Sequence, residues 1–223
     1  MSGKAGLDFD NDKLSIPEIN MDGKSLFAVI QPDTSKNQQI LSDSTFNVQL
    51  RLSANNTLQY ASDSPLYSGN PSSTGTIANN QISIVSFSLG NTLGFSINGT
   101  FQDSGVNKGS SGRSNFDQIG TRQGSSDRFD GKMGEILIIG SVSSTEIEKV
   151  EGYLAHKWGI AGNLPSSHPY KHTLSKQKIA VSSIGTNSAN ITADLIDLGG
   201  ASTSLAVMFA EANGTVLETP ETI

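Results

Sequence analysis

The fold is decided by two adjoining stretches of sequence, MGEILII at residues 133–139 and SSTEIEKVEGYLAHKWG at residues 143–159. The first is a short apolar run, which is typical of a buried β-strand. In the second, apolar side chains recur at spacings of three and four residues and so share one face of a helix; they are Ile147, Val150, Leu154 and Trp158. Ser143 and Glu146 fit a capping box at its start, and Gly159 marks its end. The two stretches predict a strand followed by an amphipathic helix whose apolar face is buried against a sheet or its loops.

Upstream of this region the sequence repeats short apolar segments, several of them alternating with polar residues, separated by turn residues. In one of them, Phe46, Val48, Leu50 and Leu52 face the same way. Asn98-Gly99 is a tight hairpin signal. The pattern predicts an antiparallel β-sandwich. The predicted strands span residues 7–10, 14–16, 25–30, 39–42, 46–52, 58–60, 82–89, 93–97, 100–101 and 116–120, and the long predicted loops span residues 61–80 and 102–115.

Composition excludes several classes of protein. The chain has 223 residues, a net charge of −6 and no cysteine. A mildly acidic protein lacks the basic surface that nucleic acid requires, so no nucleic-acid partner is expected. The absence of cysteine excludes disulfides, thiolate catalysis and cysteine-type zinc sites. No apolar run approaches the roughly 20 residues needed to span a bilayer, so no membrane insertion is expected.

The pattern changes after Pro165, and residues 173–223 hold three or four further strand-like segments. About 50 residues is too few for a complete sandwich of roughly 100 residues. We therefore expect a partial second unit over residues 173–223, beside a complete sandwich over residues 1–172. The chain is expected to be part of a larger multidomain protein.

Three motifs carry a resemblance to a known family: FDGKMGEILII at residues 129–139, GYLAHKWG at 152–159 and LPSSHPY at 164–170. This block resembles the end of concanavalin A-like, laminin-G-like jelly-roll domains of bacterial surface and secreted proteins. The resemblance implies an all-β fold, a two-sheet antiparallel jelly-roll sandwich with one C-terminal amphipathic helix. Residues 173–223 resemble the start of a fibronectin-III-like or immunoglobulin-like repeat. Members of this fold bind glycans or proteins, act as spacers, or carry glycosidase or lyase sites, so the fold does not determine the function.

Candidate ligand-binding residues combine aromatic rings with cations. Glycan sites place polar groups around an aromatic platform, and Tyr60, Tyr67 and Phe101 are the aromatic residues that we place outside the obvious core. The segment from residue 102 to 128 carries more cations than acids, among them Arg113, Arg122 and Arg128. Bidentate arginine contacts suit sulfate and carboxylate groups. The sequence therefore predicts a site for carbohydrate, with an anionic polysaccharide as one form of it.

Acidic residues near the N-terminus suggest metal binding more than catalysis. Asp10 and Asp12, with Asn11 between them, supply hard oxygen ligands of the kind that calcium prefers. The family resemblance implies one structural calcium ion near the first and last strands, where Asp10 and Glu135 would fit. Asp8 and Asp10 have the two-residue spacing of a glycosidase pair, yet they lie beside a turn, and we interpret them as turn acids or metal ligands.

The sequence as a whole predicts a non-catalytic, extracellular or cell-surface module that binds a polysaccharide or a cell-surface glycan. It contains no phosphate-binding loop, no His-x-x-x-His zinc pair and no serine, histidine and aspartate order typical of a hydrolase. Two alternatives stay open: a structural spacer in a large surface protein, and a glycoside hydrolase or polysaccharide lyase domain.

Overall fold

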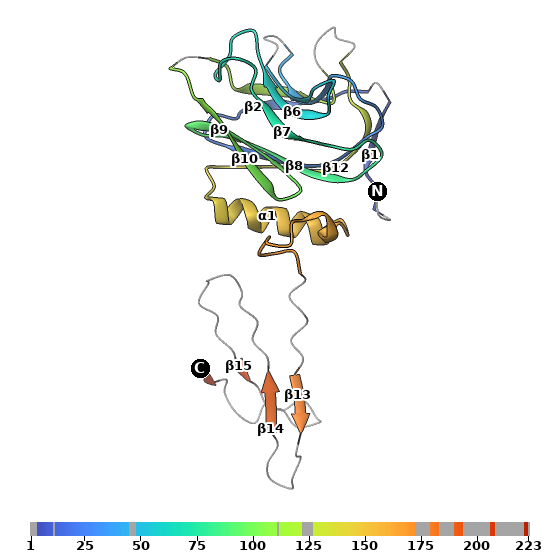
Figure 1. Cartoon of the computed structure of the whole chain (residues 1–223), viewed down its shortest axis with the longest axis vertical. Helices are drawn as coiled ribbons and strands as arrows, with labels where there is room; N and C mark the ends of the chain where they lie inside the picture. The colour runs from blue at the N-terminus through green and yellow to red at the C-terminus, as the bar shows by residue number, and fades with distance from the viewer. Residues whose placement is uncertain are drawn as a thin grey trace. The chain divides into compact units, whose positions relative to one another are not determined.

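The structure is a computed structural model that describes residues 4–10, 12–44, 48–110, 112–121, 127–172, 179–182, 190–193, 206–207 and 221–222. The chain divides into two compact units, Met1–His172 and Thr173–Ile223 (Figure 1). The first unit is a sandwich of two six-stranded sheets, in which every pair of neighbouring strands is antiparallel. The predicted fold class, a two-sheet antiparallel jelly-roll sandwich with one C-terminal helix, is confirmed.

The first sheet contains the strand predicted at residues 133–139 near one edge. In spatial order its strands are β1 (Leu7–Asp10), β12 (Asp130–Ile139), β3 (Ser25–Pro32), β8 (Ser83–Leu89), β9 (Thr92–Ile97) and β10 (Thr100–Asn107). The second sheet lies across the core from it. Its strands are β2 (Leu14–Asn20), β11 (Asn115–Ile119), β4 (Gln38–Ser42), β5 (Gln49–Leu52), β6 (Thr57–Ala61) and β7 (Ser72–Thr76).

Two stretches predicted as loops are partly strands. β7 lies inside the predicted loop 61–80, and β10 continues to Asn107 inside the predicted loop 102–115. Both are edge strands, paired on one side only. An edge strand buries few side chains, so its sequence lacks the apolar alternation by which central strands are recognised.

Strand alternation sorts the side chains of the first sheet onto two faces. On β3, Leu26, Ala28 and Ile30 belong to the core between the sheets, whereas Phe27 and Val29 belong to a second apolar cluster on the outer face. Val48, Leu50 and Leu52 lie in the main core as predicted, and Phe46 lies outside the described residues. The outer face of the first sheet is therefore apolar and requires a cover.

Helix α1 (Ser144–Lys157) supplies that cover (Figure 1). Its capping box is complete, because Ser143 N donates to Glu146 Oε2 at 2.7 Å and Glu146 N donates to Ser143 Oγ at 3.3 Å. Ile147, Leu154 and Trp158 join the outer cluster. A Cβ on Gly134 would lie 2.5 Å from the Trp158 ring, so only glycine lets the indole approach β12 this closely. After the helix, Gly159 takes a φ of 69°, and a short 3-10 turn, η1 (Ala161–Asn163), follows.

The second unit contains two short pairs of strands among its described residues. β13 (Ile179–Ser182) pairs with β14 (Asn190–Ala193), and β15 (Ala206–Val207) pairs with β16 (Glu221–Thr222), both antiparallel. Its assignment as a fibronectin-III-like or immunoglobulin-like segment stays a prediction, and most of it lies outside the described residues. Over the described part of the chain, no helix combines the length and the apolar character that crossing a bilayer requires.

Candidate functional site

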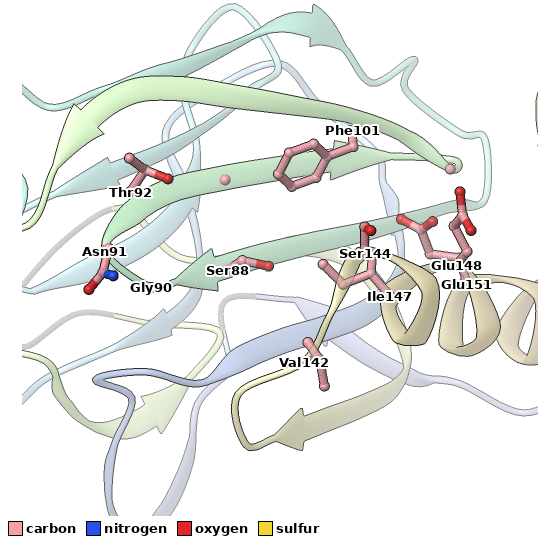
Figure 2. A pocket seen from close by; sticks show the side chains of 12 residues that line it. Ser88, Gly90, Asn91, Thr92, Phe101, Val142, Ser144, Ile147, Glu148 and Glu151 are labelled. Carbon is pink, nitrogen blue, oxygen red and sulfur yellow. The ribbon is translucent and has the colours of Figure 1, made fainter.

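A pocket of about 320 Å³ lies between the first half of α1 and the outer face of the first sheet (Figure 2). Its volume falls within the range of small-molecule sites. The sheet contributes one set of lining residues, namely Ser88, Gly90, Asn91, Thr92, Gly94, Gly99 and Phe101. The helix and the segment that leads into it contribute the others, namely Val142, Ser144, Ile147, Glu148 and Glu151.

Phe101 and Gly94 form the sheet side of the pocket. A Cβ on Gly94 would lie 2.6 Å from Phe101 Cε2, so the ring covers the bare backbone of the neighbouring strand β9. Phe101 as a residue is nevertheless 53% exposed, which is unusual for a large apolar residue in a sheet. Gly94 thus lets an aromatic ring lie on the sheet while much of its surface stays open to the pocket.

Polar groups stand at the end of the pocket formed by the turn between β8 and β9. Asn91 and Thr92 come from this turn, and Thr92 Oγ1 donates to Asp103 Oδ2 at 3.4 Å. Ser88 Oγ accepts a hydrogen bond from Ser25 Oγ at 3.0 Å. At the other end of β9, Ser96 donates to Glu151. Thr92 at the start of β9 and Gly99 just beyond its end both line the pocket, so the pocket is elongated along β9.

Glu151 is the buried acid of the site. It is 2% exposed, and Ser96 Oγ and His168 Nε2 contact its two carboxylate oxygens, the latter at 3.4 Å. Burial raises the pKa of Glu151 to about 7, although the hydrogen bond from Ser96 opposes the rise and the nearby charge of Glu148 adds to it. The His168 ring packs closely on Gly99, where a Cβ would lie 2.7 Å from its Cδ2.

The two tyrosines predicted as ligand-binding residues belong to the core, so the expectation that they lie outside it is wrong. Tyr60 and Tyr67 are fully buried, with ring centroids 5.3 Å apart in an edge-to-face arrangement. The Tyr60 hydroxyl accepts from Leu66 N at 2.9 Å, and the Tyr67 hydroxyl donates to the carbonyl of Gly90. Their hydroxyls therefore anchor loops, and burial leaves neither ring face open to a ligand.

The predicted arginines do not converge on the pocket. Arg113 and Arg128 are exposed on other parts of the sandwich, and neither lines the pocket. Arg113 joins a loop through its backbone, where its N–H donates to Ser64 O at 3.1 Å. Arg122 lies outside the described residues.

Asp10 and Glu135 lie too far apart to share an ion, so the predicted pairing of these two acids is wrong. Asp10 lies opposite Asp130 in the pairing of β1 with β12, and Glu135 follows five residues later, roughly 16 Å away at ~3.3 Å per residue. Glu135 instead binds Lys157 Nζ at 2.8 Å and accepts from Trp158 Nε1 at 3.2 Å. Asp12 is exposed. Within the described ranges, no group of three acidic or histidine side chains could hold a metal.

A second polar surface, on the outer face of the second sheet, forms several hydrogen bonds among its own side chains. Arg51 donates from Nε and Nη2 to Gln59 Oε1, at 2.9 and 2.6 Å, and from Nη1 to Gln49 Oε1 at 2.9 Å. Gln39 Nε2 also donates to Gln49 Oε1 at 3.0 Å. Gln39 and Gln49 are buried, so this row is a weaker candidate than the pocket.

Phe101 is the one lining residue of the pocket that was predicted from the sequence as a ligand-binding candidate. A signal for Glu151 was nevertheless present, because it lies four residues after Ile147 and three before Leu154, on the apolar face of the helix. A charged residue at a position predicted to be buried indicates either a structural hydrogen bond or a site.

Comparison with known proteins supplies fold neighbours and no family. No family model matches the chain, and no curated protein sequence matches it. Domain 4 of AbnA, an extracellular GH43 arabinanase from Geobacillus stearothermophilus solved with arabinotriose, is 15% identical over 68% of this chain and 79% of that chain, with a TM-score of 0.49. A putative carbohydrate binding protein from Bacteroides ovatus is 16% identical over 60% and 43%, with a TM-score of 0.46. A heptameric SAP-like pentraxin from Limulus polyphemus is 14% identical over 61% and 72%, with a TM-score of 0.44. Likeness at these identities concerns the fold alone.

Proposed function

We propose that the sandwich of residues 1–172 is a non-catalytic, extracellular carbohydrate-binding module whose ligand lies in the pocket over Phe101. The observation that carries this proposal is an aromatic residue, more than half exposed, on the wall of a pocket whose other end is polar. A sugar ring has an apolar face of C–H groups and an edge of hydroxyls. An aromatic surface with polar groups beside it complements both.

The polar lining suits hydroxyl recognition. Asn91 offers an amide that donates and accepts, and the hydroxyl of Ser144 can do either. Thr92, which donates to Asp103, can still accept from a ligand, and Ser88, which accepts from Ser25, can still donate to one. The pocket is elongated along β9, which favours a chain of sugars over a single ring.

The charge of the lining argues against the anionic polysaccharide predicted from the arginines. Two carboxylates, Glu148 and Glu151, line the pocket, and no lysine or arginine is among its described lining residues. A sulfate or carboxylate group would meet like charge here, which is unfavourable. The proposed partner is therefore an uncharged or positively charged glycan of a polysaccharide or a cell surface.

A glycan array followed by calorimetric titration of the hits tests this proposal. We expect Phe101→Ala to weaken binding about tenfold or more, a loss of about 1.4 kcal/mol, because the stacking surface is removed. Tyr153→Ala is the matched control, since Tyr153 is 51% exposed and does not line the pocket. Equal affinities of the two variants would refute the assignment of the pocket.

The two alternative functions give different outcomes on the same glycans. Uniform silence of the array would favour a structural spacer. Release of reducing sugar from any array hit, abolished by Glu151→Gln, would favour a glycoside hydrolase, because an acid with a raised pKa is the usual proton donor of such enzymes. Neither result is expected of a binding module.

A further inference from the structure

Glu151 is a buried acid without a cation beside it. Its two hydrogen-bonding neighbours are Ser96, which is uncharged, and His168. Tyr170 N donates to His168 Nδ1 at 3.2 Å, so Nδ1 is an acceptor and Nε2 carries the proton toward Glu151. Burial lowers the pKa of His168; the charge of Glu148 raises this pKa and the charge of Lys171 lowers it. The net lowering favours the neutral imidazole. A charge on Glu151 therefore has no full counter-charge in the described part of the sandwich.

Glu148 adds a second acid to the same pocket. It lies three residues before Glu151, so the two side chains are neighbours on the helix surface. Glu148 is half-buried and makes no hydrogen bond or ion pair with the described residues. Figure 2 shows both side chains at the pocket, in the neighbourhood of Phe101. A ligand in this pocket can therefore place a positively charged group beside Glu151.

A protonated amine matches this lining better than any other common group on a sugar. Its three N–H donors suit carboxylate oxygens, and its charge is attracted to the face of an aromatic ring. An N-acetyl group has neither the charge nor the three donors. A neutral hydroxyl leaves a charge on Glu151 uncompensated, which is costly for a buried group.

We infer that the pocket binds a saccharide with a free, protonated amino group, such as a glucosamine unit, whose ammonium meets Glu148 and Glu151 while the sugar ring contacts Phe101. This inference rests on the proposed carbohydrate binding and names its ligand class. It makes Glu148 and Glu151 specificity-determining residues.

Titration calorimetry of the full chain at neutral pH tests it with three β-1,4-linked tetrasaccharides, of glucosamine, of N-acetylglucosamine and of glucose. We expect the glucosamine oligomer to bind about tenfold or more tightly than the other two, which is about 1.4 kcal/mol. Glu148→Gln and Glu151→Gln should each reduce this preference by several-fold. Glu18→Gln is the control, because it removes the same charge from the other sheet.

Proton release is a second readout. Binding of an ammonium should deprotonate Glu151, so the heat of binding should depend on the ionisation enthalpy of the buffer, and Glu151→Gln should lose this dependence. If Glu151→Gln fails to fold, as its Trp158 fluorescence would show, the half-buried Glu148→Gln decides the question.

The outcomes separate failure of this inference from failure of the proposed function. Equal binding of the three tetrasaccharides, or a preference for the N-acetylated one, would overturn the inference and leave carbohydrate binding standing. Absence of binding by every saccharide would overturn both.

Discussion

Replacement of Glu151 by glutamine should remove a pH dependence of folding from the sandwich. Glutamine keeps an acceptor for the hydrogen bond from Ser96 and carries no charge at any pH. In the native chain, burial raises the pKa of Glu151 from its ordinary value of 4.5 to about 7. At 1.36 kcal/mol per pKa unit, this difference corresponds to about 3 kcal/mol.

The sign follows from proton binding. Between pH 4.5 and about 7 the folded chain holds a proton on Glu151 that the unfolded chain releases, so the free energy of unfolding falls as the pH rises through this window. The contribution is fully present below pH 4.5 and is lost above pH 7. Between about pH 5 and about pH 8 the loss amounts to about 2.5 kcal/mol.

Urea unfolding followed by Trp158 fluorescence measures this effect, because Trp158 is the chain's one tryptophan and packs between α1 and β12. At each pH, the free energy of unfolding of Glu151→Gln is subtracted from that of the native chain. The subtraction removes the contribution of other groups that titrate in both proteins, His168 among them. We expect this difference to fall by about 2.5 kcal/mol from about pH 5 to about pH 8. A difference that stays constant across this range would show that Glu151 is not a buried acid, and the argument for a missing counter-charge would fail with it.

Two further predictions concern the helix cap and the metal. Ser143→Ala should lower the free energy of unfolding by about 1 kcal/mol because it removes the side chain that caps α1, whereas Ser141→Ala, outside the helix, should change it little; equal effects would contradict the capping assignment. The predicted calcium ion, with Asp10 and Asp12 as ligands, requires that EDTA lower the thermal midpoint of the full chain and that excess calcium restore it. An unchanged midpoint would refute this ion.

Helix α1 could be predicted from sequence because its signals are local. The capping box, the spacing of Ile147, Leu154 and Trp158 and the closing Gly159 all lie within one short segment. The central strands could be predicted for the same reason. Edge strand β7 could not, because most of its side chains are at least partly exposed and its existence depends on pairing with β6.

The prediction that Tyr60 and Tyr67 lie outside the core is wrong because the average polarity of a segment does not determine whether each of its residues is buried. Tyr67 lies in a polar stretch, yet its ring packs edge-to-face on Tyr60 and its hydroxyl bonds the backbone of Gly90. A hydroxyl satisfied by a backbone carbonyl can be buried at little cost, so a tyrosine can anchor a loop from inside the core.

The pocket depends on strand register, which no local pattern specifies. Phe101 lies over Gly94 only because β9 and β10 pair with Ser96 opposite Phe101, and the helix reaches this area only because its apolar face fits β3 and β8. A shift of one residue in that hairpin would turn Phe101 into the core and close the pocket.

At Glu151 the sequence conflicts with the pattern of its own helix. An amphipathic helix built only for packing would place an apolar residue between Ile147 and Leu154, and a leucine there would avoid the cost of burying an acid. The contact of Glu151 with Ser96 explains how the acid is tolerated, and its place on the pocket wall offers a reason for its presence. Departures from local rules concentrate at functional sites, so a charge on the buried face of a helix directs attention to whatever cavity lies beside it.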